Sequence, residues 1–279
     1  MSNVKTILIT GANTGIGLAT AETFVKDGHH VIIACRNLDK ANTAQQHLQS
    51  LNKGQVDVIQ IDLNSLENVN QTANEIIAKY GKLDVLVNNA GMMTPELEAT
   101  VDGYEKQIGV NYLGPFLLTQ KLLPLFKKSE QGRVINLASM MHVLGSIKPE
   151  IFKADQIKKY NGVISYGNSK LANLLFSNAL AKQLEGSNVT SNALHPGGVD
   201  SEIYRELPKY QYNALKLFLI PTSKPAELIK KMAFTTEWSQ RNGDYASLQT
   251  PALKSRKAKD RELGQYLFDQ TIQLVHQYL

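Results

Sequence analysis

Short runs of β-branched and other apolar residues alternate along most of the chain with longer segments of helical period. This alternation is typical of βαβ units and predicts a parallel sheet. Because the runs are almost continuously apolar, we expect strands that are buried on both faces. The predicted strands are residues 4–10, 30–35, 56–61, 83–88, 133–137 and 189–194. The predicted helices are residues 15–26, 39–51, 66–80, 104–126 and 166–184.

Six strands with intervening helices predict an α/β fold with a doubly wound parallel sheet, a Rossmann fold of three α/β/α layers. The helix ends carry matching local signals. Asn64, followed three residues later by Glu67, is interpreted as a capping box. Gly28, Gly81 and Gly186 follow helical segments, where a left-handed residue often ends a helix.

The regular alternation fades after about residue 197, where three prolines interrupt a segment rich in tyrosine and leucine. We interpret residues 198–225 as a lid or substrate loop. Nothing in this segment has the composition of a linker between domains. We therefore expect a single domain over residues 1–279.

The composition of the chain indicates the class of protein and its cellular compartment. With 43% hydrophobic residues, a chain of 279 residues can bury a sizeable core, which argues against disorder. Cys35 is the only cysteine, so an internal disulfide and a multi-cysteine zinc site are excluded, and no metal is expected. We see neither a signal peptide nor an apolar run of the roughly 18 to 20 residues that span a bilayer. These features predict a soluble, cytoplasmic protein with no transmembrane segment.

The net charge permits an anionic partner but does not indicate which kind. Thirty Lys and Arg against 25 Asp and Glu give a net charge of +5. The basic run at residues 254–259 (KSRKAK) is followed by Asp260 and Glu262, and no nucleic-acid recognition motif accompanies it. We interpret this run as a solvated helix start and expect no nucleic-acid partner.

The first predicted strand leads directly into a glycine-rich turn, TGANTGIG at residues 10–17, and a predicted helix follows. Gly11 permits a tight turn, and Gly15 lets backbone N–H groups approach a pyrophosphate. Gly17 lets the helix pack closely, with its N-terminal dipole directed at the anion. After strand one of an α/β chain, this turn favours a dinucleotide site over an ordinary strand-to-helix connection.

The residue after the second strand indicates the type of dinucleotide. A site that prefers NAD places Asp or Glu here, on the ribose 2′-hydroxyl. This chain has Arg36, whose guanidinium can pair with a 2′-phosphate. NADP(H) is therefore predicted over NAD(H), the alternative being that Arg36 is only solvated. Asp62, after the third strand, either accepts from the adenine amino group or only begins the next helix.

Tyr166 and Lys170 lie four positions apart in a strongly helical segment, so both side chains project from one face. A neighbouring ammonium stabilises a phenolate and lowers the pKa of such a tyrosine toward the operating pH. Tyr212 and Lys216 repeat this spacing, but we interpret them as surface residues. The first pair differs because it follows a strand that ends at Ser139.

Ser139 and the NNAG segment at residues 88–91 both fall at the carboxyl ends of predicted strands, where open α/β sheets bind their ligands. A hydroxyl placed there can hold a substrate carbonyl. His142 either contacts substrate or is structural. The apolar residues after these strand ends indicate an apolar substrate, although core packing explains several of them equally well: Met92, Met93, Met140, Met141, Val143 and Leu144.

Taken together, the motifs resemble the short-chain dehydrogenase/reductase family over essentially the whole chain. They are the glycine turn, NNAG, Asn111, Ser139, the pair Tyr166 and Lys170, and HPG at residues 195–197. The segments ACRNLDKA, SKLANLLFSNALAKQL and NALHPGGV are similar to the branch of retinol dehydrogenases, WW-domain oxidoreductases and protochlorophyllide reductases. As in that branch, 27 positions separate Ser139 from Tyr166. Residues 145–164 are therefore interpreted as an insertion beside the substrate site.

The resemblance implies specific roles. Tyr166 acts as general acid in carbonyl reduction and as base in alcohol oxidation, while Lys170 depresses its pKa and holds the nicotinamide ribose. Ser139 polarises the carbonyl, and Asn111 keeps a water in a proton relay. The cofactor-binding positions implied are Gly11, Asn13, Thr14, Gly15, Ile16, Gly17, Arg36, Asp62, Leu63, Asn89, Ala90, Gly91, Tyr166, Lys170, Pro196, Gly197 and Val199.

The leading hypothesis is an NADP(H)-dependent oxidoreductase that moves a hydride between nicotinamide and a carbonyl or alcohol of an apolar small molecule. One alternative is a reductase of carbon–carbon double bonds. Another is a non-catalytic NADP(H) sensor, for which a broken Ser-Tyr-Lys set is expected. The resemblance also implies a homodimer or homotetramer that pairs through the helices holding Asn111 and Tyr166.

Overall fold

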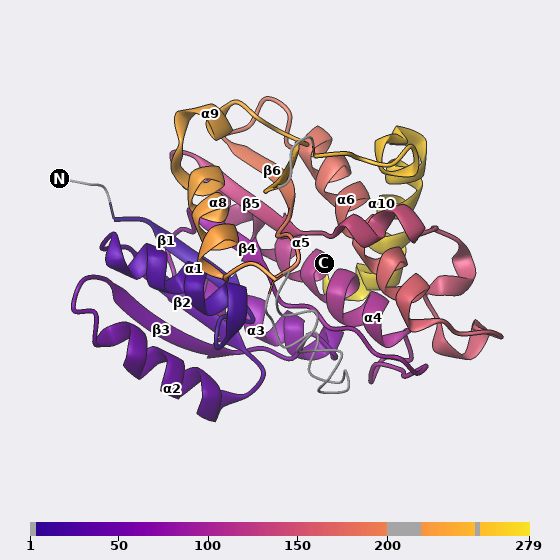
Figure 1. The fold of residues 1–279 in the computed structure, drawn as a ribbon, viewed down its shortest axis with the longest axis horizontal. Helices are drawn as coiled ribbons and strands as arrows, with labels where there is room; N and C mark the ends of the chain where they lie inside the picture. The colour runs from indigo at the N-terminus through magenta and orange to yellow at the C-terminus, as the bar shows by residue number, and fades with distance from the viewer. Residues whose placement is uncertain (1–3, 200–218, 249–251) are drawn as a thin grey trace.

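The computed structural model describes residues 4–199, 219–248 and 252–279. One parallel sheet runs through the molecule in the order β3-β2-β1-β4-β5-β6-β7 (Figure 1). Most of the predicted lid, including Tyr212 and Lys216, lies outside the described residues. The strands are β1 (Thr6–Thr10), β2 (His30–Cys35), β3 (Gln55–Gln60), β4 (Val85–Asn88), β5 (Gly132–Leu137), β6 (Val189–His195) and β7 (Tyr245–Ser247).

Helices cover both faces of this sheet, as Figure 1 shows. The first layer contains α1 (Gly15–Lys26), α2 (Leu38–Gln49) and α8 (Ser223–Phe234), which α9 (Thr236–Ser239) follows. The second layer contains α3 (Leu66–Lys79), α4 (Lys106–Ile108), α5 (Gly114–Phe126), α6 (Gly162–Gln183) and α10 (Arg261–Val275). Short 3₁₀ turns, labelled η, span Met140–Leu144 (η2), Pro149–Ile151 (η3), Ala154–Gln156 (η4), Lys257–Lys259 (η6) and His276–Tyr278 (η7).

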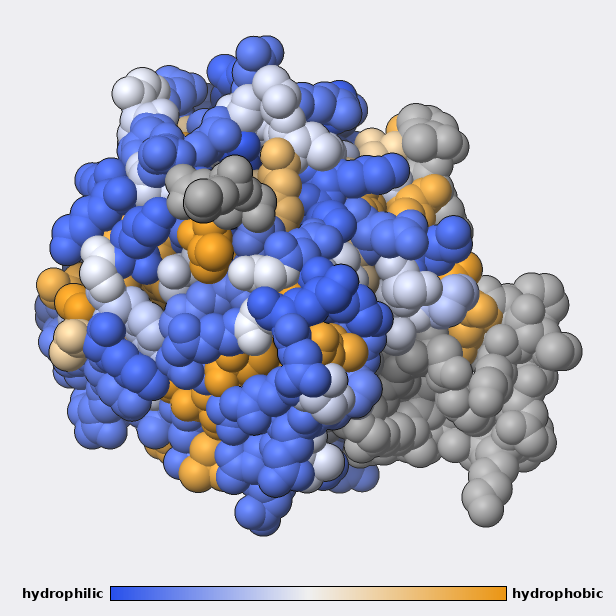
Figure 2. Space-filling model, turned by 90° about the vertical axis from the view of Figure 1, so that its left-hand side faces the viewer, coloured by the Kyte–Doolittle hydropathy of each residue, from blue (hydrophilic) through white to orange (hydrophobic). Residues whose placement is uncertain are grey.

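The central strands are buried on both faces, as their apolar runs predict. In β1, Ile7 and Ile9 pack into the core under α1 and α8, while Leu8 between them packs into the core under α5 and α6. Side chains of a strand alternate between the faces of a sheet, so a two-sided core needs an apolar residue at every position. At the β3 edge the surface is mostly hydrophilic, with small hydrophobic patches (Figure 2).

Several predicted boundaries shift for local reasons. The cap of α3 is Ser65, whose hydroxyl accepts from the Asn68 N–H, so the prediction of Asn64 as the capping residue is wrong. Gly81 does not adopt the left-handed conformation, whereas Gly28 and Gly186 do. Helix α6 begins at Gly162, four residues earlier than predicted. Its first turn therefore belongs to the predicted insertion at residues 145–164.

The predicted helix over residues 104–126 is interrupted. It consists of α4, a π-helical turn at Gly109–Leu113 (η1), and α5. Pro115 lies in the first turn of α5, where a missing N–H costs little. A π-helical turn inserts an extra residue into a helix and is frequent at functional sites. Here it contains Asn111.

The last third of the chain contains regular elements that the sequence pattern did not predict. Strand β7 has only three residues, and α8 begins at Ser223, so the predicted lid ends inside a helix. Helix α10 lies on the second layer, where the Phe268 ring contacts the rings of Phe116 and Phe176. Part of the surface predicted for subunit pairing is thus covered by α10 of the same chain. Within residues 4–199, 219–248 and 252–279, no helix combines the length and apolarity needed to cross a membrane.

Candidate active site

The glycine turn has the geometry that its sequence predicts. Gly11 and Gly15 adopt φ values of +66° and +57°, which L-residues with side chains rarely adopt. At Gly17 an added Cβ would lie 2.5 Å from the Gly11 carbonyl oxygen and 2.6 Å from Nδ2 of Asn89. Helix α1 therefore packs against the turn more closely than any side chain permits. The N-terminal turn of this helix opens on a cavity.

The NNAG segment is held against β1 by a hydroxyl. The Thr10 Oγ1 accepts from the backbone N–H groups of Asn89 and Ala90, each at 3.0 Å. The Asn89 amide donates in return to the carbonyl oxygen of Thr10 at 2.8 Å. Sequence reasoning missed Thr10 as a functional residue, although its place at the end of β1 is a usable signal. The result is a rigid wall beside the glycine turn.

Ser139, Tyr166 and Lys170 all line the same cavity of about 660 Å³. Ser139 follows β5, and its hydroxyl accepts from the Met141 N–H as the cap of η2. Tyr166 and Lys170 lie one turn apart on α6, and the Lys170 ammonium is 5.3 Å from the centre of the Tyr166 ring. Each of the three residues is at most 9% exposed. The structure thus brings together the three residues that the sequence singled out.

The Lys170 ammonium sits in a desolvated position. Nζ donates to the carbonyl oxygen of Leu137 at 3.1 Å, which leaves two of its hydrogens for other acceptors. Burial lowers the pKa of Lys170 to about 8, because water no longer stabilises the charged form. At Gly91 an added Cβ would lie 3.3 Å from this ammonium, so a larger residue there would crowd it.

Asn111 lies behind the cavity rather than in its described lining. Its amide donates to the Met92 carbonyl oxygen at 2.8 Å and to Oγ of Ser169 at 3.0 Å. Its Oδ1 accepts from the Met92 N–H at 2.8 Å. Asn111 therefore joins the segment after β4 to the helix that carries Tyr166.

His142 is structural in this geometry. Its ring is fully buried, with Nδ1 2.7 Å from the Ser139 carbonyl oxygen and Nε2 3.1 Å from the Ser255 N–H. A carbonyl oxygen can only accept and an N–H can only donate, so Nδ1 carries the hydrogen and Nε2 accepts. Burial lowers the pKa of His142, in keeping with this neutral ring. The imidazole bridges the backbone of Ser139 to the segment that precedes α10.

His195 lines the cavity, although the sequence analysis named it only as part of the HPG motif and gave it no role. It ends β6, directly before Pro196 and Gly197, and its Nδ1 accepts from the Met140 N–H at 3.4 Å. Burial lowers the pKa of His195 to about 4. The ring is therefore neutral at physiological pH and presents a polar edge to the cavity.

Most predicted cofactor positions line this one cavity. They are Gly11, Asn13, Thr14, Gly15, Ile16, Asn89, Ala90, Gly91, Tyr166, Lys170, Pro196, Gly197 and Val199. Four others are not among its described lining. Gly17 packs behind the turn, and the Leu63 side chain is part of the core. Arg36 is exposed after β2, while Asp62 is half-buried and accepts from the Asn64 N–H.

The part of the cavity where an apolar substrate is predicted is only partly apolar. Of the six apolar residues predicted there, Met93, Met140 and Met141 line the cavity. Val143 and Leu144 are 54% and 46% exposed and are not among its described lining, nor is Met92. Residues 145–164 contribute no described lining residue and pack instead against the segment before α4, where the Phe152 carbonyl oxygen accepts from the Glu105 N–H.

Comparison with known proteins agrees with this architecture. A family model described as short chain dehydrogenase matches residues 5–211. Retinol dehydrogenase 12 of Mus musculus is 37% identical over 274 residues, which cover 97% of this chain and 86% of that protein. Retinol dehydrogenase 14 of Mus musculus is 42% identical over 214 residues, which cover 73% of this chain and 64% of that protein.

Solved structures show the same fold. An uncharacterised protein from Mycobacterium paratuberculosis is 31% identical with a TM-score of 0.80, covering 98% of this chain and 93% of that chain. The active-site complex of Pseudomonas aeruginosa RhlG with NADP is 25% identical with a TM-score of 0.73, covering 88% of this chain and 95% of that chain. With its parallel sheet, its glycine turn and the matched family model, the chain belongs to the short chain dehydrogenase family of oxidoreductases.

Proposed function

We propose that the protein is an NADP(H)-dependent oxidoreductase that interconverts a carbonyl and an alcohol on an apolar small molecule. The observation that carries this proposal is the convergence of Ser139, Tyr166 and Lys170 on one cavity beside the glycine turn. A protein that only senses the dinucleotide has no need of all three. The names of the retinol dehydrogenase relatives support an apolar alcohol or aldehyde as substrate class.

The residues present fit a nicotinamide dinucleotide. An added Cβ at Gly15 would meet nothing within 4 Å, so this part of the turn leaves open space for a pyrophosphate at the N-terminus of α1. The two hydrogens left on Lys170 suit ribose hydroxyls. The dinucleotide supplies a hydride when bound. Arg36 supports NADP(H) because it lies after β2, with no carboxylate at that position.

The side chains perform the proton chemistry. In the direction of reduction, Tyr166 gives its phenolic proton to the carbonyl oxygen, and the hydroxyl of Ser139 donates a hydrogen bond to the same oxygen. The Ser139 Oγ accepts from the Met141 N–H, so the hydroxyl hydrogen remains available for the substrate. Lys170 stabilises the phenolate that results. In the direction of oxidation, Tyr166 takes the proton back.

The apolar wall favours an apolar substrate. Met93, Met140 and Met141 are flexible and polarizable, and such side chains adapt to apolar ligands of varied shape. The same wall would accept an enone, so reduction of a carbon–carbon double bond is the second candidate.

We further propose a cytoplasmic homo-oligomer. If two subunits pair through α5 and α6, then α10 must be part of the interface, because it packs on these helices.

The test is a fluorescence titration of the protein with NADPH and NADH, followed by a panel of apolar aldehydes, ketones and enones. The proposal expects tighter binding of NADPH than of NADH and consumption of NADPH on an aldehyde or ketone. Consumption on enones alone would favour the second candidate. Binding without turnover on any class would favour a sensor, and absence of binding would contradict the assignment of the glycine turn.

A further inference from the structure

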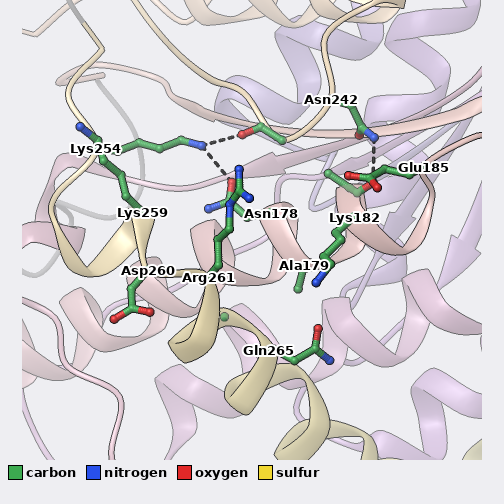
Figure 3. Close-up of a pocket in the computed structure, with 13 residues that line it drawn as sticks. Asn178, Ala179, Lys182, Glu185, Asn242, Lys254, Lys259, Asp260, Arg261 and Gln265 are labelled. Atoms are coloured by element: carbon green, nitrogen blue, oxygen red, sulfur yellow. Dashed lines mark hydrogen bonds between the residues drawn. The ribbon is translucent and has the colours of Figure 1, made fainter.

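A second cavity lies at the other end of α6 from the catalytic pair. It has a volume of about 470 Å³ and is bounded by the C-terminal half of α6, the turn before β7, and residues 254–265 leading into α10 (Figure 3). It shares no described lining residue with the active-site cavity. The proposed function does not use it.

The lining of this second cavity is strongly cationic. Lys182, Lys254, Lys259 and Arg261 contribute four positive charges, against the carboxylate of Glu185 and that of Asp260. The Asp260 carboxylate already caps α10, because its Oδ1 accepts from two backbone N–H groups at 3.0 Å each. Across the described residues, none of the four cations forms a salt bridge. The described lining therefore has a net charge of +2, which the Asp244 carboxylate outside the lining offsets only in part.

Lys254 is held in place by neutral acceptors. The Lys254 ammonium is partly buried and donates to Oδ1 of Asn178 at 2.9 Å and to the Gly243 carbonyl oxygen at 2.6 Å, both neutral acceptors. The Asn178 amide is held in turn by donation to the Ala258 carbonyl oxygen at 2.8 Å. Arg261, at the start of α10, lines the same cavity (Figure 3). Burial and the nearby Lys259 lower the pKa of Lys254 more than Asp244 raises it, and a bound anion would offset the remaining cost of the charged form.

We propose that this cavity binds the phosphate group of a small phosphorylated organic molecule between Lys254 and Arg261. A phosphate monoester carries a charge of about −1.5 to −2 at neutral pH, which matches the net charge of the lining. The volume exceeds that of a phosphate alone and falls in the range of roughly 300 to 1,000 Å³ that small-molecule sites occupy. The amide of Gln265 provides a neutral hydrogen-bonding group for the remainder of the ligand, whereas the Asn242 amide is already held by Ser191 and Ala181.

The same segment reaches the active site. Ser255, next to Lys254, donates its N–H to His142, whose ring holds the Ser139 carbonyl oxygen. Lys257 donates to the carbonyl oxygen of Gly145, at the end of η2, at 2.8 Å. A ligand bound to Lys254 and Arg261 should therefore slow hydrogen exchange of the backbone amides between residues 252 and 265.

The experiment is calorimetric titration of the full chain with inorganic phosphate and with glycerol 3-phosphate, at constant ionic strength and in saturating NADP⁺. The saturating NADP⁺ serves to keep phosphate out of the active-site cavity. If the wild-type protein does not bind NADP⁺, the titrations are carried out with the Arg36→Gln variant instead, so this test remains valid even if the proposed function fails. Arg261→Gln and Lys254→Met remove one cation each. Arg256→Gln is the matched control, because Arg256 is exposed on the same segment and does not line the cavity.

Saturable binding is expected in the wild-type protein and in Arg256→Gln, and at least tenfold weaker binding in the two cavity variants. Glycerol 3-phosphate should bind more tightly than phosphate, and exchange should slow most in residues 252–265. Absence of binding to the wild-type protein, equal loss in Arg256→Gln, or unchanged exchange in residues 252–265 would overturn the proposal.

Discussion

The cofactor side and the substrate side of this active site are held in place by different means. Around the glycine turn, Thr10, Gly17 and Asn89 meet because β1 and β4 are neighbours in the sheet. Around Ser139, support comes from His142 and Ser255, which are 113 positions apart in the chain. The first arrangement follows from strand order and strand ends. The second depends on tertiary packing of the last third of the chain.

The pair Tyr166 and Lys170 lies between these two regions, and Lys170→Met is expected to reduce turnover more than a substitution in either region. Turnover should fall by about 10² to 10³, because stabilisation of the phenolate is lost. The fold should gain about 1 to 3 kcal/mol in unfolding free energy at pH 7, because a buried charge is removed. Steady-state kinetics and urea unfolding of both proteins measure the two effects.

The gain in stability has a defined pH dependence. Burial lowers the pKa of Lys170 to about 8 in the fold from its ordinary value of 10.5. The penalty for burying the ammonium is therefore complete below pH 8, and it disappears as the pH rises through 10.5. The stability difference between the variant and the wild-type protein should shrink over this window. Wild-type turnover should also fall above pH 8, and a flat profile for both quantities would show that Lys170 is not a buried cation.

On the cofactor side, Arg36→Gln should weaken binding of NADPH by about 10- to 100-fold, because a charge-assisted hydrogen bond contributes about 1.5 to 3 kcal/mol. NADH lacks the 2′-phosphate, so its affinity in the same variant is the internal control and should not change. Arg36 is exposed, and the fold should tolerate the change. Equal weakening for both dinucleotides would remove Arg36 as the residue that reads the phosphate.

Close packing of the glycine turn is tested by Gly17→Ala. An added Cβ would approach the Gly11 carbonyl oxygen and the Asn89 amide to 2.5 and 2.6 Å, so the unfolding free energy should drop by about 1 to 3 kcal/mol. Dinucleotide affinity should fall with it. Gly81→Ala is the control, because nothing lies within 4 Å of its added Cβ and stability should change little. Equal stability of the two variants would contradict the close approach of α1 to the turn.

The substrate side is tested by His142→Ala. Removal of the imidazole leaves the Ser255 N–H without this acceptor and the Ser139 carbonyl oxygen with only the backbone N–H of residue 142, at a cost of about 1 to 3 kcal/mol in stability. We expect a fall of a few-fold in kcat, with NADPH affinity retained. His142→Gln keeps a donor and an acceptor and should restore part of the loss. Wild-type kcat in the alanine variant would show that Ser139 is positioned without this bridge.

The sequence predicted the geometry of the glycine turn and of α1 well, since strand ends and glycines are local signals. Helix α1 begins and ends at the predicted residues, and the glycines of the turn adopt the expected conformations. The sequence predicted the last third of the chain poorly. There α10 is held in place by contacts of the Phe268 ring with residues about 90 and 150 positions away, which no local pattern indicates. The role of His142 also depends on Ser255, and no short pattern joins these two residues.

The central claim is that Tyr166 transfers the proton while the rest of the site holds the dinucleotide and the substrate. The most direct test is Tyr166→Phe, with NADPH binding and carbonyl reduction measured on the same sample. We predict unchanged NADPH affinity and a loss of turnover of about 10² to 10⁴. Wild-type turnover in this variant would contradict the account.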